Sequence, residues 1–302
     1  MRSRKTDPVT RAYRTPDERF EDLPGWPFEP HHVEQDGLRL HYVDEGAGNP
    51  ILLLHGEPTR GYLYRKLIPR LAEMGRVVAP DYFGFGRSDK PLGRDWYSFD
   101  AHARSIERLV CEQLDLRRLT VVVQDWGGPI GFRLAVAHEH RVDRLVVLNT
   151  GVGVGAPSEE WLRFREFMRR VDTEIVPGQI VRIATATELP EEVVEAYNAP
   201  FPVPEAKVGV TMFPELVPTE PEHPNAPGML ETREKLSRWT KPALVLFGDS
   251  DVVFTPAHAD RMAALIPGAG PAEIVSGADH FLQEDKGGEI AARIASWIGS
   301  GR

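Results

Sequence analysis

The side chains that could do chemistry lie where short apolar runs end. Asp125 follows the apolar run 119–123 and stands directly before Trp126 and two glycines. A helical pattern of apolar residues comes next. A strand, a sharp turn and a helix in this order place one side chain at the apex, exposed above the edge of a sheet. Asp tolerates the left-handed backbone of such a turn better than most residues, although an Asp helix cap in an ordinary strand–helix unit is the plainer alternative.

Three more polar residues follow later strand-like runs. Asp249 and Asp251 come after the run 243–247, and His280 lies in the loop after the last such run. The chain order is therefore nucleophile, acid and histidine, which is one known order for a catalytic triad. Asp251 is the favoured acid because its loop can turn back toward the histidine, whereas Asp249 could cap a turn. Asp279, next to His280, is a third alternative.

An aspartate at the apex indicates a different reaction from a serine. A serine needs a base to remove its proton, while a carboxylate with an ordinary pKa of about 3.9 is ionised at pH 7. Asp125 therefore suits displacement at an alkyl carbon, which gives an ester between the enzyme and the alkyl group. His280 would then activate the water that hydrolyses this ester. Asp251 would orient the imidazole ring and stabilise its charged form.

Two groups near the apex could support negative charge. The backbone N–H groups of Trp126 and Glu57 are expected to form an oxyanion hole for ester hydrolysis. The indole of Trp126 offers one N–H donor and no acceptor, which suits a departing anion in an apolar pocket. Packing at the start of the helix is an equally good interpretation of Trp126.

The elements that must position these residues form an α/β pattern. Strand-like and helical patterns alternate up to residue 151 and again from residue 232, and a parallel sheet would bring the strand ends together. Residues 152–231 are rich in proline and contain no convincing buried strand. We predict a mostly parallel sheet with helices on both faces. Residues 1–151 and 232–302 would form the core domain, and residues 152–231 a helical cap inserted after the sixth strand.

Local signals set the expected elements. Asp36-Gly37 between two alternating runs predicts a hairpin, and residues 1–30 read as an irregular polar arm. The predicted strands are 31–35, 38–44, 51–54, 77–79, 119–123, 145–148, 243–247 and 273–275. The predicted helices include 62–74, 99–114, 257–265 and 290–298.

Composition excludes several classes of function. The chain has 302 residues and a net charge of -9, which argues against nucleic acid or an anionic membrane as the main partner. Its single cysteine, Cys111, cannot form an internal disulfide, and no zinc-type cluster is present, so we predict no metal and no cofactor. No signal peptide and no apolar run near the ~18 residues of a membrane span are found. We expect a cytoplasmic monomer.

Several segments resemble the haloalkane dehalogenases of the α/β-hydrolase superfamily, most closely the subfamily whose acid follows the seventh strand. The similarity also includes the arm at 14–31 and the hairpin at 36–46. The motifs that carry it are HGEPTRGYLYRKLIP, DYFGFGRSDKP, VVVQDWGG, AYNAPFP and GADHFLQED.

This resemblance implies hydrolysis of a small apolar halogenated substrate by water, giving an alcohol and a halide ion without a cofactor. It makes Asp125 the nucleophile, His280 the base and Asp251 the acid. Trp126 becomes one halide-binding residue. Glu57 lines the site, and its bond to the following proline is expected to be cis.

One departure from the family concerns the halide site. The family uses a second Trp from the first cap helix, in a Phe-x-x-Trp pattern, but here the run is Trp161-Leu162-Arg163-Phe164. Phe164 therefore stands where the second Trp is expected. Trp161, one turn earlier on the same helical face, could supply the second N–H, or both aromatic side chains could pack in the cap. A lost hydrogen bond to an anion, about 1.5–3 kcal/mol, would slow halide release about tenfold or more.

Other functions remain as alternatives. An epoxide hydrolase uses the same Asp-His-Asp triad but normally needs two cap tyrosines, and residues 152–231 contain only Tyr197. A fluoroacetate-type enzyme needs paired arginines, and the loop after Asp81 offers only Arg87. The remaining alternatives are a hydrolase of another substrate and a non-catalytic binding protein on the same scaffold.

Overall fold

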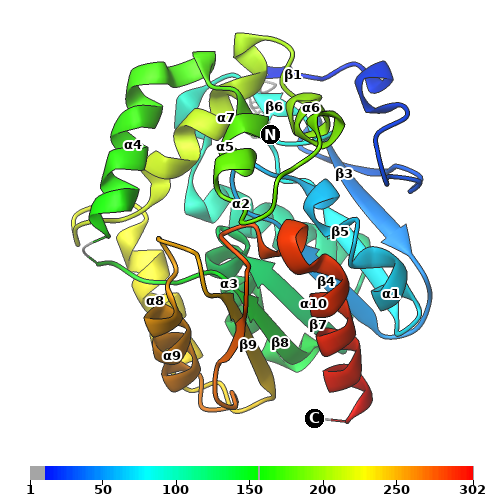
Figure 1. The fold of residues 1–302 in the computed structure, drawn as a ribbon, viewed down its shortest axis with the longest axis vertical. Coiled ribbons are helices and arrows are strands. Elements are labelled where there is room, and N and C mark those ends of the chain that lie inside the picture. Colours follow the sequence, from blue (N-terminus) through cyan, green and yellow to red (C-terminus); the bar gives the residue numbers. More distant parts are fainter. Residues whose placement is uncertain (1–10, 156, 302) are drawn as a thin grey trace, which may run out of the picture.

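A computed structural model describes residues 11–155 and 157–301. Its centre is an eight-stranded sheet (Figure 1). The strands of this sheet are β2 (His31–Gln35), β3 (Leu38–Glu45), β4 (Pro50–Leu54), β5 (Arg76–Pro80), β7 (Leu119–Gln124), β8 (Val142–Leu148), β9 (Ala243–Gly248) and β10 (Glu273–Val275).

The order of strands across the sheet is β10-β9-β8-β7-β4-β5-β3-β2. β3 is antiparallel to both of its neighbours, and the other neighbouring pairs are parallel. The predicted hairpin joins β2 to β3, with φ of 53° at Asp36 and 79° at Gly37. Positive φ at both central residues gives a turn whose twist matches that of the strands. The predicted mostly parallel α/β fold is confirmed.

Helices cover both faces of the sheet (Figure 1). Alternate strand residues face opposite sides, so Leu53 and Val122 pack with α1 and α10, while Leu52 and Val121 pack with α2, α3, α8 and α9. These helices are α1 (Ile68–Ala72), α2 (Phe99–Glu107), α3 (Gly127–Ala137), α8 (Ala226–Leu236), α9 (Pro256–Leu265) and α10 (Leu282–Gly299).

A helical segment follows β8, the sixth strand of the sheet in chain order. Between β8 and β9 the described residues contain helices and turns but no strand. In Figure 1 the first four of these helices lie across the upper part of the molecule, while α8 packs on α3 and passes the predicted boundary at residue 231. The four are α4 (Glu159–Val171), α5 (Pro177–Ile183), α6 (Glu191–Asn198) and α7 (Val208–Met212).

Several boundaries differ from the predicted ones. The N-terminal arm is irregular except for the short strand β1 (Ala12–Tyr13), which pairs with β6 (Lys90–Pro91), and one short turn of helix; residues 1–10 lie outside the described part. Instead of one helix over 62–74, a 3-10 turn precedes α1. α10 starts eight residues before the predicted start, because a kink at Lys286 joins two helical pieces.

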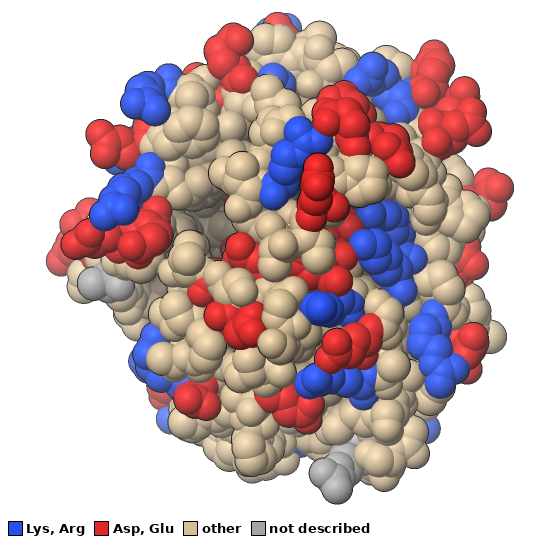
Figure 2. Space-filling model, in the orientation of Figure 1, with Lys and Arg blue, Asp and Glu red and all other residues tan. Residues whose placement is uncertain are grey.

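The surface carries charges of both signs. On the face drawn in Figure 2, acidic and basic side chains are interspersed rather than gathered in one extended patch. Among the described residues, no helix combines the length and the apolar character that crossing a bilayer requires.

Candidate active site

Asp125 lies at the turn between β7 and α3, with φ of 49°. Its N–H donates to the carbonyl of Asn149 at 3.0 Å, and its own carbonyl accepts the N–H of Gly128 at 2.9 Å. A Cβ at Gly127 would lie 2.0 Å from the carbonyl oxygen of Leu54. Only glycine therefore lets α3 start so close to β4, and the strand–turn–helix arrangement is the one that the sequence predicts.

The two carboxylate oxygens of Asp125 have different surroundings. Oδ1 accepts the backbone N–H of Glu57 at 2.9 Å, and Oδ2 lies 3.8 Å from Nε2 of His280. Burial raises the pKa of Asp125, while His280 and the backbone N–H groups of Trp126 and Glu57 act against this rise. Both N–H groups expected for an oxyanion hole thus act on this carboxylate. The Glu57–Pro58 bond is cis, as expected.

His280 is paired with Asp251. Nδ1 of the ring lies 2.9 Å from Oδ2 of Asp251, and Oδ1 of Asp251 accepts the backbone N–H groups of Val253 at 2.7 Å and Phe254 at 2.9 Å. The Phe254 ring is stacked on the imidazole, with centroids 5.9 Å apart. Burial alone would raise the pKa of Asp251, but His280 and the two N–H donors lower it. Asp251 is therefore a fixed and ionised partner.

The other two candidate acids are engaged elsewhere. Asp249 accepts the hydroxyl of Ser276 and the N–H of Gly277, each at 2.9 Å. Oδ1 of Asp279 accepts the backbone N–H of His280 at 2.7 Å. Neither carboxylate has the hydrogen bond to the imidazole ring that Asp251 makes.

The charge state of His280 depends on three carboxylates. Burial would lower the pKa of His280, but Asp251, Asp125 and Asp279 together raise it to about 9. The ring is therefore protonated at neutral pH while Asp125 carries its negative charge.

Two site residues were missed by the reasoning from sequence. The Asn149 amide, buried after β8, donates to Oδ2 of Asp251 and to the carbonyl of Asp279, both at 3.0 Å. Gln124, the last residue of β7, donates to the carbonyl of His280 at 3.2 Å and has its amide nitrogen 3.3 Å from Nε2 of the ring. Their position at strand ends was the available signal, but amides do not titrate and drew no attention.

A cavity of about 480 Å³ adjoins Asp125, and Trp126 and Trp161 also line it. The Trp126 ring packs edge-on against Phe213, with centroids 5.3 Å apart. Phe164 is not among the described residues that line this cavity, and it packs against the large apolar core instead. The structure therefore separates the two cap aromatic residues that the sequence placed on one helical face.

Glu57 is buried beside Asp125. Its residue is 7% exposed, and Oε1 has no hydrogen-bond partner among the described residues. Burial and the nearby charge of Asp125 raise the pKa of Glu57 well above its usual range. The surroundings of Glu57 therefore favour its neutral form.

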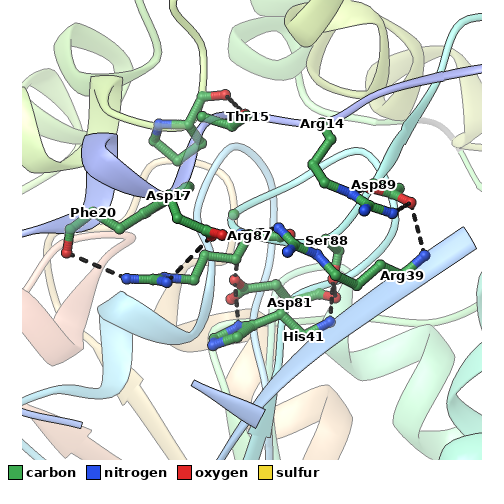
Figure 3. A network of polar contacts seen from close by, with 12 residues as sticks. Arg14, Thr15, Asp17, Phe20, Arg39, His41, Asp81, Arg87, Ser88 and Asp89 are labelled. Carbon is green, nitrogen blue, oxygen red and sulfur yellow. Dashed lines mark hydrogen bonds and ion pairs between the residues drawn. The ribbon is translucent and has the colours of Figure 1, made fainter. Parts of the chain in front are cut away.

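Residues that alternative functions need lie elsewhere. The hydroxyl of Tyr197 is buried and hydrogen-bonded to Glu284. Arg87 contacts Asp17 and the carbonyl of Phe20, each at 3.4 Å, in the network drawn in Figure 3. Neither side chain lines the cavity beside Asp125.

The sheet, the apex residue and the paired histidine define the class of α/β-hydrolases. A family model described as the alpha/beta hydrolase fold matches residues 49–187. The haloalkane dehalogenase of Psychrobacter cryohalolentis is 43% identical over 301 residues, covering 95% of this chain and 98% of that protein. Haloalkane dehalogenase 1 of Mycobacterium tuberculosis is 44% identical over 296 residues, covering 94% and 97%.

A solved structure gives the same answer. Haloalkane dehalogenase DpaA from Paraglaciecola agarilytica, described as a tetramer, superimposes with a TM-score of 0.89 at 36% identity, covering 94% of this chain and 97% of that one. This chain belongs to the haloalkane dehalogenase family.

Proposed function

We propose that this protein hydrolyses small apolar haloalkanes to an alcohol and a halide ion, through an ester on Asp125. One observation carries the proposal. The backbone N–H of Glu57 fixes Oδ1 of Asp125 at 2.9 Å, which leaves Oδ2 toward His280 at 3.8 Å. A half-buried carboxylate with Oδ1 held by the Glu57 N–H and Oδ2 facing His280 suits attack on carbon.

In the first step, Oδ2 of Asp125 forms a bond to the carbon that carries the halogen. The carbon–halogen bond breaks, and its electron pair leaves with the halide. The indole N–H of Trp126 lines the same cavity, so we assign it the hydrogen bond to the departing anion. No proton moves in this step.

In the second step, His280 takes a proton from water and the hydroxide adds to the ester carbon of Asp125. The negative charge that develops falls on the oxygen held by the Glu57 N–H, and the Trp126 N–H also acts on this carboxyl group. The collapse of this intermediate expels the alkoxide, which takes the proton back from the imidazolium and leaves as the alcohol. The carboxyl group of Asp125 then releases one proton to solvent. Asp251 stabilises the imidazolium. Esterification removes the charge of Asp125, one of the groups that raise the pKa of His280. The pKa of the ring therefore falls, which favours release of its proton to solvent before it accepts one from water.

The proposal assigns residues 152–231 as a cap over the core formed by 1–151 and 232–302. The supporting contact is that Trp161 of α4 lines the cavity with Asp125. Trp161 is the candidate second halide donor, and Phe164 is assigned to packing. The monomeric state and cytoplasmic location remain predictions; sizing by light scattering tests the first, against the tetramer described for DpaA.

Epoxide hydrolysis is disfavoured. Opening an epoxide needs a hydroxyl aimed at the oxygen, and Tyr197, the only tyrosine in 152–231, donates to Glu284 instead. The test runs bromide release from 1-bromobutane and 1,2-dibromoethane beside diol formation from styrene oxide. Bromide without diol supports the proposal, and diol without bromide rejects it.

The nucleophile is tested by trapping. We expect Asp125→Ala and His280→Phe both to lose turnover, with an alkyl-enzyme ester accumulating only in the His280 variant. Mass spectrometry after incubation with 1-bromobutane measures the adduct, and peptide mapping locates it. Absence of an adduct in a folded His280→Phe protein would remove Asp125 from the nucleophile role.

A further inference from the structure

The cavity beside Asp125 carries opposite charges on its lining. Asp125 is the only carboxylate among the described residues that line it, whereas Arg233 of α8 and Arg261 of α9 both contribute to its wall. Asp125 has an 18% exposed side chain, while both arginines are exposed residues. The carboxylate therefore marks the inner end and the guanidinium groups mark the end toward solvent.

Apolar side chains form part of the wall of this cavity. A chain of methylene groups could lose contact with water against them. The apolar side chains involved are Val152, Val154, Val217, Met229, Met262 and Leu265.

The positions of both arginines on their helices direct them to the cavity. Arg233 lies one helical turn after Met229 on the face of α8 that lines the cavity. Its stem passes so close to Gly153 that a Cβ there would lie 2.9 Å from Cδ of Arg233. Gly153 has φ of 128°, a conformation that residues with side chains rarely adopt.

Arg261 belongs to one face of α9. His258, Met262 and Leu265 also line the cavity. Together with Arg261 they are spaced three or four residues apart, so they lie on one face of the helix. An arginine in the middle of this face holds its charge at the cavity wall.

Neither guanidinium is neutralised within the described part of the chain. Ion pairs in this region involve other cations, such as Arg238 with Glu234 and Lys235 with Glu231, each at 2.7 Å. No ion pair within 11–155 or 157–301 includes Arg233 or Arg261. Two uncompensated positive charges therefore face one cavity in a protein of net charge -9.

We propose that the substrates include haloalkanes with a carboxylate at the far end of the chain, which Arg233 and Arg261 bind. This inference rests on the proposed dehalogenase function and narrows its substrate class. The halogen end would lie between Asp125 and Trp126, the methylene chain along the apolar wall, and the carboxylate between the guanidinium groups. Guanidinium is suited to this because its N–H groups match carboxylate geometry.

The carboxylate at the far end of the substrate does not change the reaction at Asp125. With 6-bromohexanoate, the carbon–bromine bond breaks, the carbon–oxygen bond to Asp125 forms, and bromide leaves with the electron pair. Water then gives 6-hydroxyhexanoate and one proton. The carboxylate of the substrate takes no part in bond making.

The experiment compares kcat/KM for 6-bromohexanoate and 8-bromooctanoate with that for 1-bromohexane and 6-bromo-1-hexanol, by bromide release. The measured quantity is the ratio of carboxylate to neutral substrate, in wild type, Arg233→Gln, Arg261→Gln and the double variant. Because both arginines are exposed, we expect the ratio to fall about threefold for one substitution and about tenfold for both. Added salt should shrink the difference.

Arg238→Gln is the matched control. It removes an exposed guanidinium just after α8 that is paired with Glu234 and does not line the cavity. The ratio should stay at the wild-type value in this variant, and thermal melting checks that all variants are folded.

The outcomes separate the two proposals. Carboxylate binding is overturned if the ratio of kcat/KM for carboxylate to neutral substrates is equal in wild type and the double variant. It is also overturned if kcat/KM falls equally for both substrate types. Either result leaves haloalkane hydrolysis intact. No bromide from any of the four compounds overturns the proposed function itself.

Discussion

Two histidine–aspartate pairs in this molecule, one buried and one partly exposed, have the same contact and different surroundings. Nδ1 of His41 lies 2.8 Å from Oδ2 of Asp81 (Figure 3), and Nδ1 of His280 lies 2.9 Å from Oδ2 of Asp251. Asp81 directly follows β5, as Asp251 follows β9 within three residues. The hydrogen bond alone therefore does not distinguish a structural pair from a catalytic one.

The surrounding charges separate the pairs. Burial lowers the pKa of His41, and the nearby Arg87 and Arg60 add to this effect against Asp81. Three carboxylates raise the pKa of His280 to about 9 despite its burial. The second ring nitrogen also differs: Nε2 of His41 is buried without a partner among the described residues, whereas Nε2 of His280 faces Asp125.

The two carboxylates differ in the same way. Oxygens of Asp81 also accept the backbone N–H groups of Gly61 and Arg87, both at 2.8 Å. Burial would raise the pKa of Asp81, but His41 and the Arg60 guanidinium hold it well below its usual range. The His41–Asp81 pair is enclosed by the fold next to cations, and the His280–Asp251 pair faces Asp125. The comparison predicts that the His41–Asp81 pair contributes to the free energy of unfolding and that the His280–Asp251 pair contributes to kcat.

Asp251→Asn should have the largest effect on rate. An amide at this position can still accept from Val253 and Phe254, but it cannot stabilise the imidazolium. We expect kcat to fall about 10⁴-fold, as in triads whose acid becomes an amide, with the ester on Asp125 persisting. Bromide release and mass spectrometry measure both effects. A loss below tenfold in kcat would show that Asp251 is not needed for the reaction.

Asp81→Asn should act on stability instead. Its removal leaves the buried Arg60 charge without its nearby anion, and breaking a buried charge network typically costs about 3–5 kcal/mol. Urea unfolding measures the loss, and kcat of the folded protein should stay near that of wild type. Asp143→Asn, at a partly exposed pair with Arg118, is the control, with a change of about 1 kcal/mol or less. Equal losses in the two variants would contradict the assignment of Asp81.

The raised pKa of His280 makes stability depend on pH. A folded pKa of about 9 against about 6.5 in the unfolded chain gives up to about 3 kcal/mol, fully present below pH 6.5 and lost as pH rises through 9. Lys90 opposes this trend, because burial lowers its pKa to about 7 and its penalty disappears as pH rises above 7. The difference between wild type and His280→Gln therefore isolates the histidine.

Urea unfolding from pH 6 to pH 9.5 gives the two curves. The stability advantage of wild type over His280→Gln should shrink across this range. A constant difference would mean that the carboxylates around His280 do not hold its proton in the folded state.

Much of this arrangement could be predicted from local sequence. Apolar runs predicted the central strands β4, β5, β7, β8 and β9, because a strand buried on both faces needs a continuous run; alternating runs predicted β2 and β3. Asp125 and His280 follow such runs, so their meeting at one sheet edge needs only the parallel topology. Asp36-Gly37 predicted its hairpin because few dipeptides accept positive φ twice.

What the sequence did not predict depends on tertiary packing. Asn149 and Gln124 act through amide contacts across strands, and their position at strand ends was the only local signal. The spacing of Trp161 and Phe164 places them on one side of α4, but packing directs only Trp161 to the cavity and leaves Phe164 against the core. The predicted end of the cap at residue 231 falls within a continuous helix, α8, where no change of pattern occurs.

Bromide binding gives the smallest predicted effect. It tests whether residues 152–231 contribute to the site that contains the His280–Asp251 pair. Trp126 and Trp161 line one cavity, so each indole N–H can contact the same anion. Loss of a hydrogen bond to an ion costs about 1.5–3 kcal/mol, so Trp126→Phe should weaken bromide binding about tenfold or more. Trp161→Phe should weaken it less, because α4 lies at the surface and its indole stays partly exposed.

Inhibition of 1-bromobutane turnover by bromide measures the affinity without relying on tryptophan fluorescence. Trp297→Phe, on α10 and away from the cavity, is the matched control. If Trp161→Phe binds bromide as wild type does, Trp126 is the sole indole donor and Phe164 marks a lost halide contact. If both variants weaken binding and the control does not, the second indole donor lies one helical turn earlier on α4, at Trp161 instead of position 164. In that case α4 contributes to a halide site whose other donor, Trp126, follows β7.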